Sequence, residues 1–157
     1  VMLDGRGNVM ITDFGLAASA EENSQLTATG TVLGTPSYMP PEQARGKHDE
    51  MGKWSDIYSL GVMLYELVTG QRPFDLGGNR PSEIDEIVSH RIPAPPSRLA
   101  RPASLAAAAA WSRDLDSIVQ KALEKEPGRR YRSAAELADN LDDWDRELEK
   151  LEVFANT

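Results

Sequence analysis

The segment from Ser55 to Thr69 constrains the fold of this chain most strongly, because apolar residues cover more than one side of the helix that it predicts. Ser55 is a good N-cap and Asp56 suits the first turn of that helix. Gly70 and then Pro73 supply the stop signals. A helix that is apolar on most sides belongs in the middle of a core. The sequence therefore predicts a helix over 55–69 at the centre of a helical domain.

Three other segments carry helical patterns, which predict helices over 81–89, 114–124 and 133–153. The last of them has a heptad-like seam of apolar residues, formed by Leu137, Leu141, Trp144, Leu148 and Leu151. Such a seam either packs on its own domain or mediates self-association through 137–151. We expect packing on the same domain as far as Trp144 and leave both arrangements open beyond it.

The start of the chain has two short β-prone runs, 1–3 and 9–12, around a turn-forming segment rich in Gly, Asp and Asn. This pattern predicts a β-hairpin. The fold class expected from the whole pattern is mainly α with a short N-terminal β-hairpin. Because a native domain seldom begins inside a hairpin, we also expect the chain to be a piece of a longer domain.

The second β-prone run leads into Asp13-Phe14-Gly15 and then into a polar segment, 17–35, which has no helical or alternating period. A segment of that length without a period predicts a long surface loop. An Asp on a loop after a strand can hold the magnesium ions that bridge nucleotide phosphates, and Gly15 lets the backbone turn sharply. The alternative is an Asp in an ordinary turn at the end of a strand.

The composition excludes several kinds of site. The chain has no cysteine, so it can form neither disulfides nor zinc–thiolate sites and has no thiol nucleophile. Its formal net charge is −8, and the sequence shows no basic patch of the kind that binds nucleic acid. No apolar run is long enough for a bilayer. We therefore expect a cytoplasmic chain with no nucleic-acid partner and no membrane segment within these residues, and we leave open a membrane anchor elsewhere in the parent protein.

Four motifs follow one another along the chain, and together they are far more specific than any one alone. They are Asp13-Phe14-Gly15, Gly34-Thr35-Pro36-Ser37-Tyr38-Met39-Pro40-Pro41-Glu42, Ser55-Asp56-Ile57-Tyr58-Ser59-Leu60-Gly61 and Pro127-Gly128-Arg129-Arg130-Tyr131. In this order they resemble the C-terminal lobe of bacterial serine/threonine protein kinases of the eukaryotic (Hanks) type. Because the resemblance covers essentially the whole chain, residues 1–157 are expected to be a partial protein kinase domain.

The resemblance implies roles for particular residues. Asp13 is the expected magnesium ligand, and the activation segment is expected over 13–42. Thr35 is expected beside the catalytic aspartate and close to the substrate hydroxyl, and the motif around it favours Ser and Thr over Tyr as acceptors. The implied cofactors are ATP and Mg²⁺, and the implied partners are protein substrates.

The loop of the expected activation segment also contains hydroxyl groups at the positions where similar bacterial kinases carry activating phosphates. The candidates are Thr27, Thr29 and Thr31, with Ser24 as a weaker one. A phosphate there adds roughly −1.5 to −2 charge and can order the loop by pairing with arginine. The alternative is a solvated Thr-rich loop without modification.

The resemblance further implies an ion pair between Glu42 and Arg130, which ties the end of the activation segment to the connection before the last helix. Arg129 is the neighbouring alternative, but the spacing after Pro127 favours Arg130. Asp56 resembles the aspartate that accepts hydrogen bonds from the catalytic-loop backbone. It also suits the positive end of the helix dipole, and the two roles are compatible.

The family's glycine-rich loop, its ATP-pairing lysine and its catalytic loop do not occur among these 157 residues. We therefore expect the chain alone to be inactive, because the base, the nucleotide clamp and the second metal ligand are missing. A protein that joins it to those parts is expected to transfer the γ-phosphoryl group of ATP to Ser or Thr. The alternative is a pseudokinase-type scaffold or protein-interaction module.

Overall fold

The structure, a computed structural model, describes residues 2–3, 5–6, 9–10, 36–99 and 114–155 of the chain. These residues fall into two units, one within Val1–Leu33 and the other within Gly34–Thr157. In the first unit, strands β1 (Met2–Leu3) and β2 (Val9–Met10) pair antiparallel, with Met2 opposite Met10. Residues 4, 7 and 8 between the strands lie outside the described part, so the complete hairpin stays a prediction.

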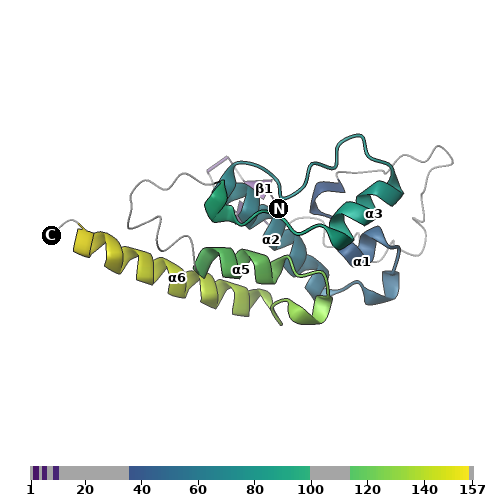
Figure 1. Cartoon of the computed structure of the whole chain (residues 1–157). Coiled ribbons are helices and arrows are strands. Elements are labelled where there is room, and N and C mark those ends of the chain that lie inside the picture. Colours follow the sequence, from purple (N-terminus) through teal and green to yellow (C-terminus); the bar gives the residue numbers. More distant parts are fainter. Residues whose placement is uncertain (1, 4, 7–8, 11–35, 100–113, 156–157) are drawn as a thin grey trace. The chain divides into compact units, whose positions relative to one another are not determined.

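The described part of the second unit is mainly helical, which agrees with the expected fold class (Figure 1). Its elements in chain order are η2 (Pro36–Tyr38), α1 (Pro41–Ala44), η3 (His48–Glu50), α2 (Lys53–Thr69), α3 (Pro81–His90), η4 (Pro96–Arg98), α5 (Asp116–Ala122), η6 (Pro127–Arg129) and α6 (Ala134–Ala155). No helix among the described residues combines the length and the hydrophobicity that a membrane span requires.

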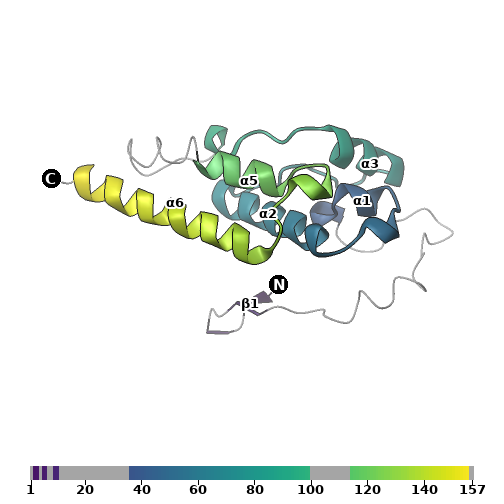
Figure 2. The same cartoon turned by 90° about the horizontal axis from the view of Figure 1, so that it is seen from below.

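Helix α2 lies at the centre of this unit, as its apolar pattern predicts. It contacts α5, which in turn contacts α6, and Figures 1 and 2 show α5 beside α2 with α6 running along α5. One buried cluster joins the three helices and the connection before α6; it consists of Ile57, Ile118, Ala122, Tyr131 and Leu137. The core therefore depends on contacts between segments that are far apart in the sequence.

The heptad-like seam of α6 packs on this same core in its first half. Leu137 is buried, and Leu141 and Trp144 are partly buried against the core cluster. The expected packing on the same domain is therefore confirmed as far as Trp144. The side chains of Leu148 and Leu151 lie outside the described residues, so self-association through the rest of the seam stays a prediction.

The start of α2 differs from the expectation. The helix begins at Lys53, so Ser55 is not the N-cap but the third residue of the first turn. The hydroxyl of Ser55 accepts a hydrogen bond from the Gly52 backbone N–H at 3.1 Å and donates one to Glu42 Oε1 at 2.8 Å. Because the serine hydroxyl serves these two partners, it supports the helix start from inside the first turn. The expected end is confirmed, since Gly70 caps the helix with a φ of 74°.

The other helices differ from the predicted ranges mainly at their ends. Helix α3 extends one residue past 89, and α6 covers Ala134–Ala155 instead of 133–153. Helix α5 is shorter than the predicted 114–124 at both ends. Its C-terminal end is early because the chain turns away after Ala122, and the carbonyls of Glu124 and Lys125 then accept hydrogen bonds from Arg130.

Helices α2 and α5 approach so closely at Gly61 that we expect Gly61→Ala to lower stability. A β-carbon at Gly61 would lie 2.8 Å from Ala122 Cβ and 3.3 Å from the Ala122 carbonyl carbon, closer than carbon atoms pack. Alanine gains about 1 kcal/mol in helix propensity, but overpacking a core costs about 1–3 kcal/mol. Chemical denaturation should therefore show a net loss. Gly128→Ala is the control, because its β-carbon meets open space; equal stability of the two variants would contradict the close approach.

Candidate functional site

Two prolines place a buried carboxylate at the start of α1. Pro40 has an extended backbone and Pro41 is the first helical residue, a position that suits proline because its missing N–H has no partner there. Glu42 follows in the first turn and is only 1% exposed. A carboxylate this deeply buried requires a cationic partner. That partner is Arg130, which lies 88 residues later in the sequence.

Glu42 and Arg130 form a two-pronged ion pair. Arg130 Nη1 donates to Glu42 Oε1 at 2.8 Å, and Nη2 donates to Oε2 at 2.8 Å. Both side chains are shielded from water, with side-chain exposures of 1% for Glu42 and 0% for Arg130. This fork geometry matches the planar guanidinium to the planar carboxylate and makes the contact strong and directional.

The remaining donors of Arg130 bind three backbone carbonyls. Nη1 also donates to Trp54 O at 2.8 Å, Nη2 to Lys125 O at 3.1 Å, and Nε to Glu124 O at 2.8 Å. All five N–H groups of the guanidinium are thereby used. Arg130 therefore joins α1, the start of α2 and the connection after α5 at one point.

The pair also sets the protonation of Glu42. Burial by itself raises the pKa of this carboxyl, but the hydrogen bonds from Arg130, from the backbone and from Ser55 outweigh burial and lower the pKa below its usual value. Because the pKa in the folded state is depressed, the stability that the pair contributes is present at neutral pH. It is lost as the pH falls through the lowered pKa.

A second set of polar contacts, the Tyr38 cluster, lies between η2 and α2. It consists of Ser37, Tyr38, Ser59, Glu66 and Arg72. The Tyr38 hydroxyl donates to Glu66 Oε2 at 2.6 Å, and Ser59 Oγ donates to Tyr38 O at 3.0 Å. The hydrogen bond to Glu66 is the main cause of the raised pKa of Tyr38. These contacts hold η2 against the middle of α2.

Arg72 completes the Tyr38 cluster from the segment after α2. Its Nη1 donates to Ser37 Oγ at 2.7 Å, and its Nε lies 3.4 Å from Glu66 Oε1. The guanidinium carbon is 5.9 Å from the centroid of the Tyr38 ring. The expected activation segment therefore ends, over its described residues 36–42, between two fixed points: the Tyr38 cluster and the Glu42–Arg130 pair.

Several expected site residues cannot be placed. Those outside the described residues are Asp13, Gly15, Ser24, Thr27, Thr29, Thr31 and Thr35. Asp56 is described, and it lies exposed in the first turn of α2, where it suits the helix dipole. Its contact with a catalytic loop stays a prediction.

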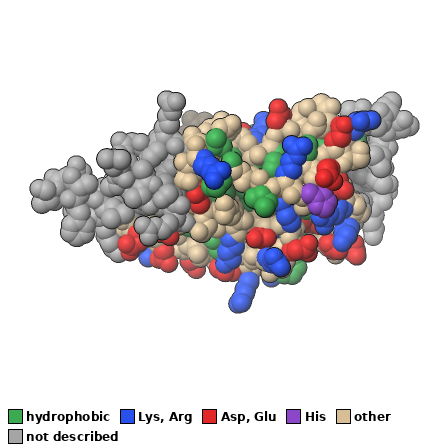
Figure 3. Space-filling model, viewed as in Figure 1, with side chains coloured by type: hydrophobic (Ala, Val, Ile, Leu, Met, Phe, Trp, Pro, Cys, Tyr) green, Lys and Arg blue, Asp and Glu red, His purple; other side chains and the backbone are tan. Residues whose placement is uncertain are grey.

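The histidines and carboxylates of the described residues do not assemble into a metal site. Within 36–99 and 114–155, no group of three or more such side chains could hold a metal ion. His90 is exposed and lies 3.9 Å from Glu86 on the same helix. On the face of the molecule in Figure 3, basic side chains are interspersed with acidic ones among the coloured residues.

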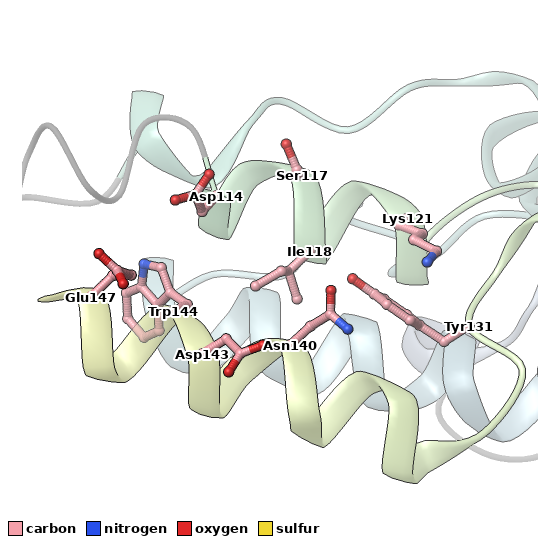
Figure 4. Close-up of a pocket in the computed structure, with 9 residues that line it drawn as sticks. All are labelled: Asp114, Ser117, Ile118, Lys121, Tyr131, Asn140, Asp143, Trp144 and Glu147. Carbon is pink, nitrogen blue, oxygen red and sulfur yellow. The ribbon is translucent and has the colours of Figure 1, made fainter.

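A pocket of about 330 Å³ lies between α5 and α6 (Figure 4). It is lined by Asp114, Ser117, Ile118, Lys121, Tyr131, Asn140, Asp143, Trp144 and Glu147. Lys121 Nζ lies 3.2 Å from Glu136 Oε1 and 4.0 Å from the centroid of the Tyr131 ring. Ile118 and Tyr131 belong to the core cluster, and none of the expected site residues that the structure describes lines the pocket.

Most contacts of the Tyr38 cluster were not predicted from the sequence. One signal was present: Glu66 is the only charged residue between Ile57 and Thr69. A single carboxylate in an otherwise apolar helix needs a donor from another segment. Tyr38 is that donor, and it belongs to the motif over 34–42, in which the resemblance implied roles for Thr35 and Glu42 but none for Tyr38.

Comparisons with known proteins point to one family. A family model described as "Protein kinase domain" matches residues 1–141. The chain is 42% identical over 142 residues to the serine/threonine-protein kinase PknB of Mycobacterium tuberculosis, with 90% of this chain and 21% of that protein covered. PknB of Mycobacterium leprae is 38% identical over 141 residues, with 90% of this chain and 21% of that protein covered. A probable serine/threonine-protein kinase of Corynebacterium efficiens is 38% identical over 143 residues, covering 90% of this chain and 20% of that protein.

Proposed function

This chain belongs to the protein kinase family, and we propose that it forms the C-terminal-lobe portion of a serine/threonine protein kinase. The chain spans about a fifth of the length of the curated relatives that it matches. The activity proposed here therefore belongs to a longer protein that contains the chain. In that protein, the γ-phosphoryl group of ATP is transferred to Ser or Thr of protein substrates.

The observation that carries this proposal is the buried Glu42–Arg130 pair. Two charges removed from water are kept only if the geometry is good and every remaining donor is satisfied, and both conditions hold here. The pair fixes the end of the segment 13–42 to the helical core. A phosphotransferase needs such an anchor, because its substrate site must be held in place while the loop before it changes conformation.

The residues upstream of the anchor carry the proposed chemistry. The Asp13 carboxylate offers oxygen ligands, which Mg²⁺ prefers, and Gly15 gives the loop its sharp turn. When bound, the metal neutralises charge on the nucleotide phosphates. Thr35 lies close along the chain to the Tyr38 cluster and orients the acceptor hydroxyl. Phosphates on Thr27, Thr29 or Thr31 order the loop, and Asp56 supports the catalytic loop.

We propose that the chain alone is inactive, because the base and the nucleotide clamp do not occur in its sequence. A cytoplasmic location follows from the same function, since ATP and protein substrates are found there. Self-association through the end of the 137–151 seam remains a proposal for the part of the seam beyond Trp144.

The experiment uses the full-length product of the gene that encodes this chain, incubated with radiolabelled ATP and peptides containing Ser, Thr or Tyr. We expect label on the Ser and Thr peptides with Mg²⁺ present and none after chelation of the metal. Returning Mg²⁺ should restore the transfer. Label on the Tyr peptide alone, or no transfer under any metal condition, would reject the proposal; the second result would favour the scaffold.

A further inference from the structure

The hydroxyl of Ser37 is already in the contact that a phosphorylated serine would need. Ser37 is partly exposed in η2, and its Oγ accepts a hydrogen bond from Arg72 Nη1 at 2.7 Å. Arginine binds phosphate with two parallel N–H donors, and such bonds are roughly twice as strong as neutral ones. The guanidinium and the hydroxyl belong to segments 35 residues apart, so tertiary structure brings them together.

Arg72 is only weakly held by its other partner. Its Nε lies 3.4 Å from Glu66 Oε1, and the side chains of Arg72 and Glu66 are 45% and 34% exposed. Ion pairs between side chains as exposed as these contribute little to stability. Glu66 also accepts the much shorter hydrogen bond, 2.6 Å, from the Tyr38 hydroxyl. Arg72 can therefore turn from Glu66 toward a stronger anion, while Glu66 keeps Tyr38.

We propose that Ser37 is a phosphorylation site and that Arg72 binds the phosphate placed on it. Ser37 is not one of the phosphorylation candidates Thr27, Thr29 and Thr31, and it lies in η2, within the described end of the expected activation segment. The inference rests on the proposed function in one respect, the enzyme that adds the phosphate. That enzyme is a serine/threonine kinase, either a second copy of this protein or a different kinase.

The reaction is an ordinary phosphoryl transfer. Ser37 Oγ forms a bond to the γ-phosphorus of ATP while the bond from that phosphorus to the β–γ bridging oxygen breaks. ADP leaves, and the hydroxyl proton passes to a base of the phosphorylating kinase. The product carries a charge of roughly −1.5 to −2 at neutral pH next to the Arg72 guanidinium.

The phosphate changes the partners within the Tyr38 cluster. A dianion on Ser37 attracts Arg72 and repels the Glu66 carboxylate, so the long Arg72–Glu66 contact breaks first. Tyr38 and Ser59 keep η2 attached to α2 through their own hydrogen bonds. Phosphorylation therefore alters the charge next to the proposed substrate site without releasing the segment.

The test for phosphate binding places phosphoserine at position 37 of the full-length product by genetic encoding and follows the phosphate by ³¹P NMR during a pH titration. A neighbouring guanidinium lowers the second pKa of the phosphate, so Arg72→Gln should raise that pKa by about 0.5 or more. Arg80→Gln is the matched control, because Arg80 is an exposed arginine paired with Glu83, and it should leave the phosphate pKa unchanged. Equal phosphate pKa values in the Arg72→Gln variant and the parent would overturn the proposal.

Occurrence of the modification is tested on the full-length protein isolated from its own cells. Mass spectrometry should find the peptide that contains Ser37 in a phosphorylated form, with fragment ions that separate Ser37 from Thr35. Recovery of this peptide only without phosphate would overturn the proposal. Both tests are independent of the transfer assay. A failure of the transfer assay would therefore not contradict phosphorylation of Ser37, and a failure of these two tests would not contradict the proposed kinase activity.

Discussion

Arg130→Ala should lower the free energy of unfolding by roughly 3–5 kcal/mol, because it leaves the Glu42 carboxylate buried without its counter-ion. The same substitution removes the donors for the carbonyls of Trp54, Glu124 and Lys125. A loss of this size is a large fraction of the stability of an ordinary domain. Chemical denaturation and thermal melting of the full-length product, followed with and without the substitution, measure it.

The neighbouring arginine provides the control for this prediction. Arg129 is exposed at the end of η6, so Arg129→Ala should change stability by no more than about 0.5 kcal/mol. Arg130→Lys keeps a positive charge but cannot supply five donors in a fork, so it should fall between the parent and Arg130→Ala. If the Arg130→Ala and Arg129→Ala variants had the same melting temperature, the conclusion that the buried pair stabilises the fold would be wrong.

The centre of the fold could be predicted because it depends on local pattern. Helix α2 is apolar on most sides, and that property alone indicates a central position, where the structure has it. The start of α2 could not be predicted in the same way. The hydroxyl of Ser55 has its partner in Glu42, 13 residues earlier, and the local sequence contains no sign of that contact.

The same reasoning explains the end of α5. The sequence over 114–124 favours a helix, but the chain leaves the helix after Ala122 and presents two carbonyls to Arg130. The early end of α5 depends on Arg130, which lies outside the segment, so the sequence of the segment alone could not predict it. Tertiary contacts override local propensity in such cases.

The candidate site was predicted unevenly. The Glu42–Arg130 contact followed from the resemblance to kinases, because two residues 88 positions apart share no local pattern that could link them. The Tyr38–Glu66 hydrogen bond joins residues 28 positions apart and was missed. Asp13, Thr35 and the phosphorylation candidates lie outside the described residues, so their roles stay predictions.

Among these roles, that of Asp13 decides the chemistry. A carboxylate that binds the nucleotide-bound metal helps to stabilise the charge that develops in the transition state of the transfer. Its loss should therefore lower the rate of transfer much more than the stability of the fold. Asparagine keeps the size of the side chain but removes its charge. We expect Asp13→Asn to reduce phosphoryl transfer by a factor on the order of 10² or more, while the melting temperature stays close to that of the parent.

The most direct test is the ratio of kcat/KM for phosphoryl transfer to a Ser or Thr peptide between the full-length parent and its Asp13→Asn variant, at saturating Mg²⁺. Asp49→Asn serves as the control, because Asp49 is an exposed carboxylate in η3. A loss of about a hundredfold or more in Asp13→Asn, with full activity in Asp49→Asn, is the predicted result. Undiminished transfer by Asp13→Asn would contradict the assignment of this chain to the metal-binding part of a working kinase.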